Sequence, residues 1–496
     1  MIVPFMFGLV DPIRYLWIFE KYADFSYRNN YAIIFEEELN HNPEEFSDYK
    51  AVRTNFCPLY DFEILSLEKL SILHKAIITK QEKDVLFNGF SSEMDGRCYL
   101  ASNRYDKFEE LIESKLQLLE EQFGKIDAIL SWVWFPSLDY CAKKRGITVI
   151  AQEFSAVRGM SPYHETMGYF NFDRRHDSKQ IEKSYCEFCP DIKKQLVFSR
   201  RELLALLLDR DNLDVINRLD EATYEFGIDI SMERDAFFHI YSKHSEKQIL
   251  QEFSDLVLPS NVLARFHPIC RPANIESEIY DIDDSPNATE WILKCKRIVS
   301  VVSNIAFDAI LLGRVSYSIC ENMPYYFNNM QDFKWVEDSP ADVGYLNFIV
   351  FGYYVPWKLM FDPEYIKWRL TNPGITEIYQ YNMEYFLKSN SLNYEELLKM
   401  PPVHRMEAIL KAKHKLDGQE IIQYVERVEK IPYSELIENL ANLEDRVSSL
   451  ENEKKQMVQH IHNLQIEREN ILNSTSWKIT KPIRYTLDKL KKNKKN

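Results

Sequence analysis

The sequence predicts an α/β protein with two Rossmann-like sheet domains, followed by a coiled-coil helix. Three observations predict this fold class. Strand and helix patterns alternate over residues 126–151 and again over residues 236–319, and a heptad repeat of apolar residues runs through residues 436–471. Alternating β and α segments are typical of parallel sheets with helices on both faces. A chain of 496 residues has room for two or three domains.

The first sheet domain is expected over residues 1–185. Apolar runs and helix-face spacing predict a strand over 1–5, a helix over 104–124, a strand over 126–134, a helix over 136–145 and a strand over 147–151. Gly124 suits the C-terminal cap of the first of these helices. The last three elements form a βαβ unit, so the sheet is expected to be parallel.

The second sheet domain is expected over residues 186–400, after a charged helical bridge over 174–222. The predicted strands cover 236–241, 261–266, 298–302 and 315–319, and the predicted helices cover 245–253 and 305–312. Residues 321–400 are rich in Tyr, Phe and Trp, and we expect helices there that close this domain or cross back to the first. A helical connector is expected over 401–434.

A coiled coil is predicted over residues 435–473. Leu436, Leu443, Leu450, Met457, Leu464 and Ile471 recur every seven residues, with charged residues on the flanks. A lone helix of this kind would expose its apolar seam, so two or three chains are expected to associate. The alternative is a helix packed on its own body.

Charge separates the body of the chain from its end. The net charge is −15, yet residues 478–496 carry eight basic residues against one acid. The acidic body argues against nucleic acid as a partner. The tail, residues 474–496, interleaves Trp477 and Tyr485 with lysines, which fits an anionic membrane surface. A soluble Lys-rich terminus is the alternative.

Compartment signals point to the cytoplasm. The N-terminus lacks the basic region and cleavage site of a secretion signal. No run of about 18 apolar residues occurs, so no membrane span is expected. The eight cysteines are expected to be free thiols. A metal or redox role for the single Cys186–Cys189 pair is the less favoured interpretation, because the sequence has no second pair of this kind to complete a site.

Two short motifs follow predicted strands of the second domain. Arg265-Phe266-His267-Pro268 closes the strand at 261–266, and Ser303-Asn304 follows the strand at 298–302. Ligands of doubly wound sheets bind at the carboxyl ends of strands. Ser303 is placed to cap the next helix, and a helix N-terminus with a nearby histidine suits a phosphate. Alternatively, Ser303 only caps its helix and His267 only satisfies a loop carbonyl.

Three carboxylates are candidates for catalysis. Glu153 follows the strand predicted at 147–151 and could act as a general base, or simply pair with Arg158. Asp229 and Asp235 flank the strand expected to open the second domain. Either could be a nucleophile or an electrostatic stabiliser, or a solvated turn acid. The acidic run that begins at Asp281 is interpreted as a turn, and no metal site is predicted.

The segments 152–158 and 166–173, together with the two motifs of the second domain, resemble the retaining β-Kdo transferases of bacterial O-antigen and capsule assembly. The resemblance covers about residues 1–400. It implies a GT-B-like fold, in which two Rossmann-type domains face a cleft and the nucleotide binds to the C-terminal one. It also implies CMP-Kdo as the donor substrate, with no separate cofactor.

The same resemblance implies roles for individual residues. The donor would be bound by Arg265, His267, Pro268, Ser303 and Asn304. Asp235 would be the nucleophile that forms a covalent Kdo adduct, with Asp229 as the alternative. Glu153 would be the acid/base that handles the acceptor hydroxyl.

Residues 474–484 are similar to the Ser-x-Ser-Trp-x-x-Thr-x-Pro-Leu-Arg ending of many bacterial polysaccharide-assembly enzymes, with Ile483 in place of Leu. This resemblance implies a cytoplasmic enzyme that is peripheral on the inner face of the cytoplasmic membrane. It also implies a lipid-linked glycan acceptor, which the enzyme would cap. A GT-B transferase with another nucleotide-sugar donor, or a non-catalytic scaffold of an assembly complex, remains an alternative.

Overall fold

The chain divides into two compact units, residues 1–424 and 425–496, in a computed structural model. The structure describes residues 1–9, 16–160, 162–172, 178–188, 195–230, 240, 242, 244–266, 280–283, 285, 287–300, 303–319, 328–329 and 341–429. The fold described here is that of the first unit. The predicted coiled coil and basic tail lie outside the described residues. In the described part, no helix is long and apolar enough to cross a membrane.

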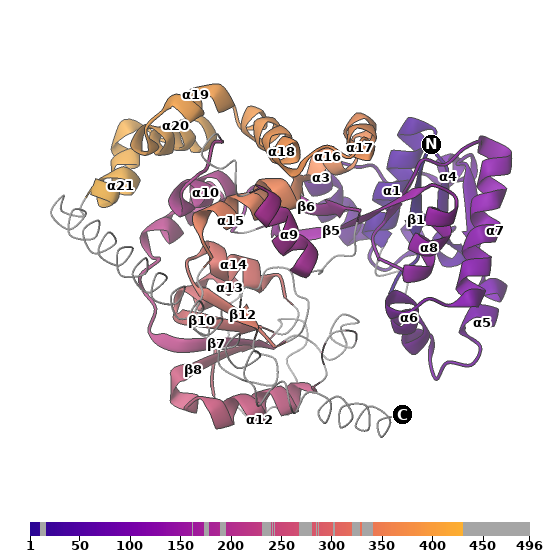
Figure 1. The fold of residues 1–496 in the computed structure, drawn as a ribbon, viewed down its shortest axis with the longest axis horizontal. Coiled ribbons are helices and arrows are strands. Elements are labelled where there is room, and N and C mark those ends of the chain that lie inside the picture. Colours follow the sequence, from indigo (N-terminus) through magenta and orange to yellow (C-terminus); the bar gives the residue numbers. More distant parts are fainter. Residues whose placement is uncertain are drawn as a thin grey trace, which may run out of the picture. The chain divides into compact units, whose positions relative to one another are not determined.

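The first sheet has seven strands in the order β13-β6-β5-β4-β1-β2-β3. Figure 1 labels β1, β5 and β6 of this sheet. Its strands are β1 (Ile2–Met6), β2 (Ile33–Glu36), β3 (Lys75–Ile78), β4 (Ala128–Ser131), β5 (Thr148–Arg158), β6 (Thr166–Asn171) and β13 (Tyr354–Pro356). Strands β1 to β5 run parallel, and β6 pairs antiparallel with both β5 and β13. The predicted parallel sheet is confirmed, and so is the return of the 321–400 region to the first domain.

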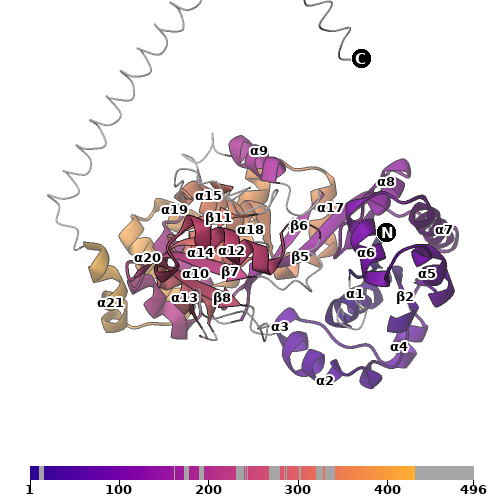
Figure 2. The same ribbon diagram turned by 90° about the horizontal axis from the view of Figure 1, so that it is seen from below.

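Helices cover both faces of this sheet. One apolar core packs α1 (Leu16–Asn29), α16 (Trp357–Met360) and α17 (Pro363–Leu370) on one face. The other core packs α5 (Lys80–Phe87), α6 (Glu93–Ser102), α7 (Asp106–Phe123) and α8 (Pro136–Lys144) on the opposite face. Figure 2 shows α1 on one side of β2 and α5 and α7 on the other. Burial of both faces explains why the strands read as continuous apolar runs.

Short helices connect β2 to β3, and they are α2 (Tyr49–Ala51), α3 (Cys57–Tyr60) and α4 (Leu67–Ser71). The predicted helices at 104–124 and 136–145 are confirmed as α7 and α8. Gly124 and Gly146 follow them at φ 89° and 68°, a backbone region that favours glycine.

The second sheet has six parallel strands in the order β12-β11-β10-β7-β8-β9. They are β7 (Tyr224–Ile230), β8 (Val262–Phe266), β9 (Asp281–Ile282), β10 (Cys295–Ser300), β11 (Val315–Ser318) and β12 (Asn328–Asn329). Its helices are α12 (Glu246–Leu256), α13 (Ala288–Leu293) and α14 (Ile305–Leu311). The predictions of strands at 261–266, 298–302 and 315–319 and of both helices are confirmed. The GT-B-like class, with two mainly parallel sheets packed against helices, is therefore the observed one.

Further helices join and close the two sheets. The bridge holds α9 (Ser178–Phe188) and α10 (Arg200–Leu207), and the C-terminal part holds α15 (Val343–Asn347), α18 (Ile375–Ser389), α19 (Tyr394–Lys399), α20 (Pro402–His414) and α21 (Gly418–Glu429). A π-helix over Phe348–Tyr353 leads into β13. The expected helical character of residues 174–222 and 401–434 is confirmed where the chain is described.

Three sequence predictions need correction or lie outside the described part. Strand β5 does not stop before Glu153 but continues to Arg158, because its second half pairs with β6. The strand at Tyr224–Ile230 was not predicted, and the one predicted at 236–241 lies outside the described residues apart from Ile240. The acidic run interpreted as a turn begins as an edge strand, β9, because Asp281 and Ile282 pair with β8.

Candidate functional site

Three polar side chains lie in one row at the carboxyl end of the second sheet. Strand register pairs Asp229 on β7 with Arg265 on β8 and with Ser300 on β10. All three are buried, with exposures of 5%, 4% and 0%. They share a face because residues in register on neighbouring strands point the same way. A buried polar row at the carboxyl end of a parallel sheet is where ligands of this architecture bind.

Asp229 is the centre of this row. The hydroxyl of Ser300 donates to Oδ2 of Asp229 over 3.4 Å, and Ser303 contributes a further hydrogen bond. Burial raises the pKa of the Asp229 carboxyl to about 6, although the Ser303 bond, the positive charge of Arg265 and the Ser300 bond each lower it. Desolvation therefore outweighs the favourable partners. The site holds a carboxyl group that titrates close to neutral pH.

The guanidinium of Arg265 contacts Asp283 and Ser285, which precede α13 in the chain. Its Nη1 donates to the carbonyl of Ser285 over 2.6 Å and lies 3.4 Å from Oδ1 of Asp283. Asp283 also accepts from Nζ of Lys294 over 2.6 Å. Arg265 thus ties β8 to the segment that leads into α13, while its charge still acts on Asp229.

The Ser303–Asn304 turn joins β10 to α14. The hydroxyl oxygen of Ser303 accepts the backbone N–H of Ile305 over 3.3 Å, and Asn304 takes the N-cap position. Ser303 therefore does not occupy the N-cap position that the sequence predicted for it, although its hydroxyl still accepts an N–H at the start of the helix. The same hydroxyl bonds to Asp229, so the turn and the carboxylate form one unit.

A contact from the first part of the chain reaches α14. The hydroxyl of Tyr163 donates to Oδ1 of Asp308 over 2.5 Å. Burial raises the pKa of the Asp308 carboxyl to about 7, against lowering by Tyr163 and Arg158. Because Asp308 lies one turn beyond Asn304, this bond fixes the helix that follows the Ser303 turn to the segment between β5 and β6.

Glu153 belongs to the other sheet. It lies inside β5, in register with Tyr169 of β6, and its Oε1 accepts the N–H of Phe154 over 2.9 Å. The guanidinium of Arg158 donates to the carbonyl of Ser155 over 3.2 Å and lies over the Phe154 ring. The sequence predicted Glu153 at the end of a strand, whereas in the structure Glu153 lies within a paired strand.

Of the predicted site residues, the structure brings together Asp229, Arg265 and Ser303, with Asn304 adjacent in the turn. Asp235, His267 and Pro268 lie outside the described residues. Ser300 and the Tyr163–Asp308 pair were missed, although Ser300 ends an apolar run in the same way as Asp229 does. Within the described ranges, no group of three or more His, Cys, Asp or Glu side chains is arranged to hold a metal ion.

Comparison with known proteins gives one family match. Residues 4–178 match the model described as the Glycosyltransferase 99 family N-terminal domain. This segment contains β1 to β6, which is the first sheet apart from β13. No curated protein matches the chain.

Several solved structures show weak similarity. One is KpsC of Thermosulfurimonas dismutans, titled a beta Kdo 2,7 transferase, at 11% identity and a TM-score of 0.35, covering 49% of this chain and 82% of that one. The wall teichoic acid polymerase TagF shows 13% identity and a TM-score of 0.18, covering 89% and 90%. Likenesses at these TM-scores do not assign a function. The family match covers residues 4–178, less than half of the chain, and supports a glycosyltransferase.

Proposed function

We propose that this protein transfers Kdo from CMP-Kdo to a hydroxyl of a lipid-linked bacterial surface glycan, with retention of configuration. The observation that carries the proposal is the Asp229 row at the carboxyl end of a parallel sheet, in a chain whose residues 4–178 match the Glycosyltransferase 99 family N-terminal domain. GT-B-like folds bind the donor nucleotide on the second domain, which is where this row lies.

The donor would meet the two turns that follow β8 and β10. In this proposal, His267, Ser303 and Asn304 hold the CMP phosphate and ribose, and Pro268 shapes the first turn. In this proposal Arg265 lies behind the two turns and contributes its positive charge, because its guanidinium already bonds to Asp283 and Ser285. Hydroxyl, amide and backbone N–H groups at such turns are suitable phosphate donors.

The chemistry would proceed in two displacements. A carboxylate attacks the anomeric carbon, the bond to CMP breaks, and CMP leaves with the bonding electron pair. The acceptor oxygen then attacks the same carbon and releases the carboxylate, while Glu153 takes the acceptor proton. Two inversions give net retention. Asp235 is the first candidate for the nucleophile, and Asp229 is the alternative.

Donor cleavage tests the proposal directly. Purified protein is expected to release CMP from CMP-Kdo, and Asp235→Ala and His267→Ala are each expected to lower the rate by at least about 100-fold. A coupled CMP assay, with UDP- and GDP-sugars in parallel, measures this. Turnover of a UDP- or GDP-sugar instead would replace the donor assignment. Absence of any donor cleavage would leave the scaffold alternative and reject the enzyme.

The C-terminal part is proposed to place this activity at the membrane. Removal of residues 476–496 is expected to abolish co-sedimentation with anionic liposomes, because the basic and aromatic residues are lost together. Truncation at Ile431 is expected to give a smaller species by light scattering, because the predicted coiled coil is removed. Unchanged sedimentation would exclude the tail as the anchor, and an unchanged mass would exclude the coiled coil as the oligomerisation element.

A further inference from the structure

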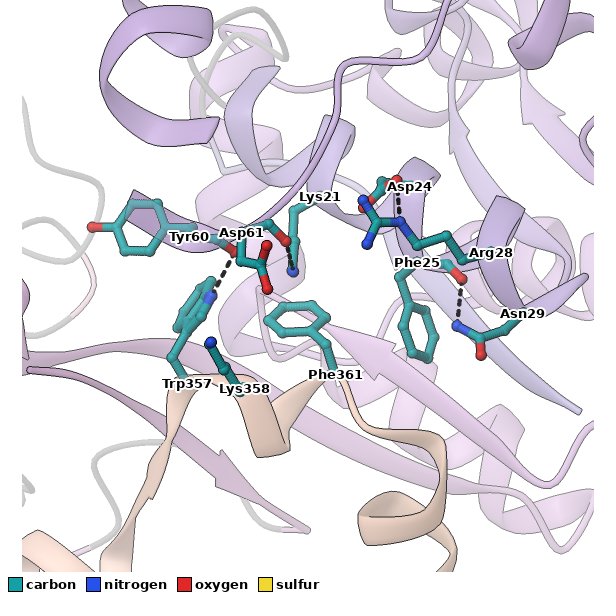
Figure 3. A pocket seen from close by; sticks show the side chains of 10 residues that line it. All are labelled: Lys21, Asp24, Phe25, Arg28, Asn29, Tyr60, Asp61, Trp357, Lys358 and Phe361. Carbon is teal, nitrogen blue, oxygen red and sulfur yellow. Dashed lines mark hydrogen bonds and ion pairs between the residues drawn. The ribbon is translucent and has the colours of Figure 1, made fainter. Parts of the chain in front are cut away.

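A cavity of about 160 Å³ lies beside α1 in the first domain (Figure 3). Its walls come from α1, from the end of α3 with Asp61, and from the Trp357–Phe361 segment. It opens to solvent, because Arg28, Asp61 and Lys358 on its rim are exposed. Helix α1 belongs to the first sheet domain, whereas the donor is expected at the carboxyl edge of the second sheet.

The cavity contains a buried cation, Lys21, that forms no ion pair with another described residue. Lys21 is 8% exposed, its Nζ donates to the carbonyl oxygen of Asp61 over 2.8 Å, and it lies 4.6 Å from the centre of the Phe361 ring. Within the described part of the chain it forms no ion pair, and the nearby Asp24 is paired with Nε of Arg28 over 2.8 Å. Buried ammonium groups normally have an anionic partner. Among the described residues, the carboxylates of Asp24 and Asp61 act on Lys21, but neither forms an ion pair with it.

The charges around Lys21 favour an incoming anion. Burial lowers the pKa of Lys21 to about 8. Asp24 and Asp61 raise it, and Arg28 and Lys358 lower it. Lys358 is an exposed second cation of the cavity wall, and Figure 3 shows Lys21 directed toward Phe361 and the amine of Lys358 beside Trp357. An anion between these two lysines would interact with both of their positive charges.

The rest of the wall suits a ring with hydroxyl groups. Phe361 and Trp357 present aromatic surface, and the Asp61 carboxylate can accept hydrogen bonds from hydroxyls. A cavity of roughly 150 Å³ is large enough for one six-membered ring. Apolar walls with a few placed polar groups are typical of small-molecule sites.

We propose that this cavity binds a carboxylated sugar ring, whose carboxylate meets Lys21 and Lys358 and whose ring packs on Phe361. The carboxylated sugar is either a free monosaccharide or one residue of a glycan chain. The site does not depend on the identity of the donor, so failure of the donor assay would leave it untouched.

Isothermal titration of the full chain with D-glucuronate tests the proposal. We expect saturable binding of glucuronate, and binding of D-glucose and of inorganic phosphate that is weaker by about tenfold or more, because each lacks one of the two contacts. Lys21→Met is expected to weaken glucuronate binding by a similar factor and to leave the melting temperature unchanged or higher. Affinity is expected to fall as the pH rises through about 8, where Lys21 loses its charge.

Two further variants keep the test decisive if Lys21→Met fails to fold. Lys358→Met changes an exposed residue of the site and is expected to weaken glucuronate binding, whereas Lys388→Met, an exposed lysine of α18, is the matched control and is expected to bind normally. Methyl glucuronide distinguishes a free monosaccharide from a residue of a glycan chain. If it binds as tightly as glucuronate, the ligand is a residue within a chain, and if it does not bind, the ligand is the free sugar. Absent glucuronate binding, equal binding of glucose or phosphate, or unaffected Lys21 and Lys358 variants would overturn the proposal.

Discussion

Asp229→Asn is expected to lower donor turnover by about 100-fold or more while the folded protein stays at least as stable. Asparagine has the shape of aspartate, and its amide oxygen can still accept the Ser300 and Ser303 hydroxyls. Only the negative charge next to the Ser303 turn is lost. A buried charge at a site where charge develops during the reaction has effects of this size.

The pKa of Asp229 sets the pH dependence of this effect. Folding raises the pKa from 3.8 to about 6, so the folded state binds the proton more tightly than the unfolded chain does. This stabilising contribution is complete below about pH 4 and is lost as the pH rises through 6. At pH 8 the ionised carboxylate therefore costs the parent protein up to about 3 kcal/mol, which asparagine avoids. Turnover by the parent is expected to fall as the pH drops below 6.

Initial rates of CMP release and urea unfolding at pH 5 and pH 8 measure both effects. Asp255→Asn, at an exposed position of α12, is the control and should change neither. Intact mass after rapid denaturation with donor compares Asp229→Asn with Asp235→Asn, because only loss of the nucleophile removes the covalent adduct. Full turnover by Asp229→Asn at pH 8 would exclude a role for this charge in catalysis.

Arg97→Met is expected to destabilise the first domain by about 3–5 kcal/mol. Glu36 is fully buried at the end of β2, where its Oε1 accepts the Gly8 N–H over 3.0 Å and Nη1 of Arg97 over 3.1 Å. Arg97 also donates to Oε2 of Glu36 and, over 2.5 Å, to the Gly8 carbonyl. Methionine fills the space of the side chain but leaves Glu36 with Lys83, 3.2 Å away, as its remaining cation.

Urea unfolding followed by tryptophan fluorescence measures this loss. Arg104→Met is the matched control, because Arg104 forms a two-bond pair with Glu109 at 2.8 and 2.9 Å but has a side chain that is 49% exposed. Exposed pairs contribute about 1 kcal/mol or less. Equal losses in the two variants would show that burial does not determine the strength of the Glu36 pair.

Local sequence patterns were enough to predict most of the helices and strands. The apolar stripe and Gly124 predicted α7, and the capping residue Ser245 marks the start of α12, where its hydroxyl accepts the Gln248 N–H over 3.2 Å. Such signals lie within a few residues of each other, so they can be read along the chain. The same holds for β8, β10 and the Ser303 turn, and hence for the fold class.

Pairing partners far along the chain were not visible in the sequence. Glu153 was expected at a strand end, yet β6 and β13 extend the sheet around it. Asp229 was expected beside a strand that begins later, because Gly227 and the polar Tyr224 and Glu225 make β7 a weak strand pattern. Glu36 and Arg97 are 61 residues apart, and nothing in either segment predicts their contact.

The sequence by itself determined the alternation of strands and helices, the strand ends that carry Arg265 and Ser303, and the acidic body with its basic tail. These follow from side-chain periodicity and composition, which each segment carries on its own. Only the tertiary structure decided that Asp229, Ser300 and Ser303 form one unit and that Lys21 is buried without an ion pair to another described residue. Register between strands and burial from water arise when distant segments pack, and it is burial that turns an ordinary carboxyl or ammonium group into one poised to react or bind.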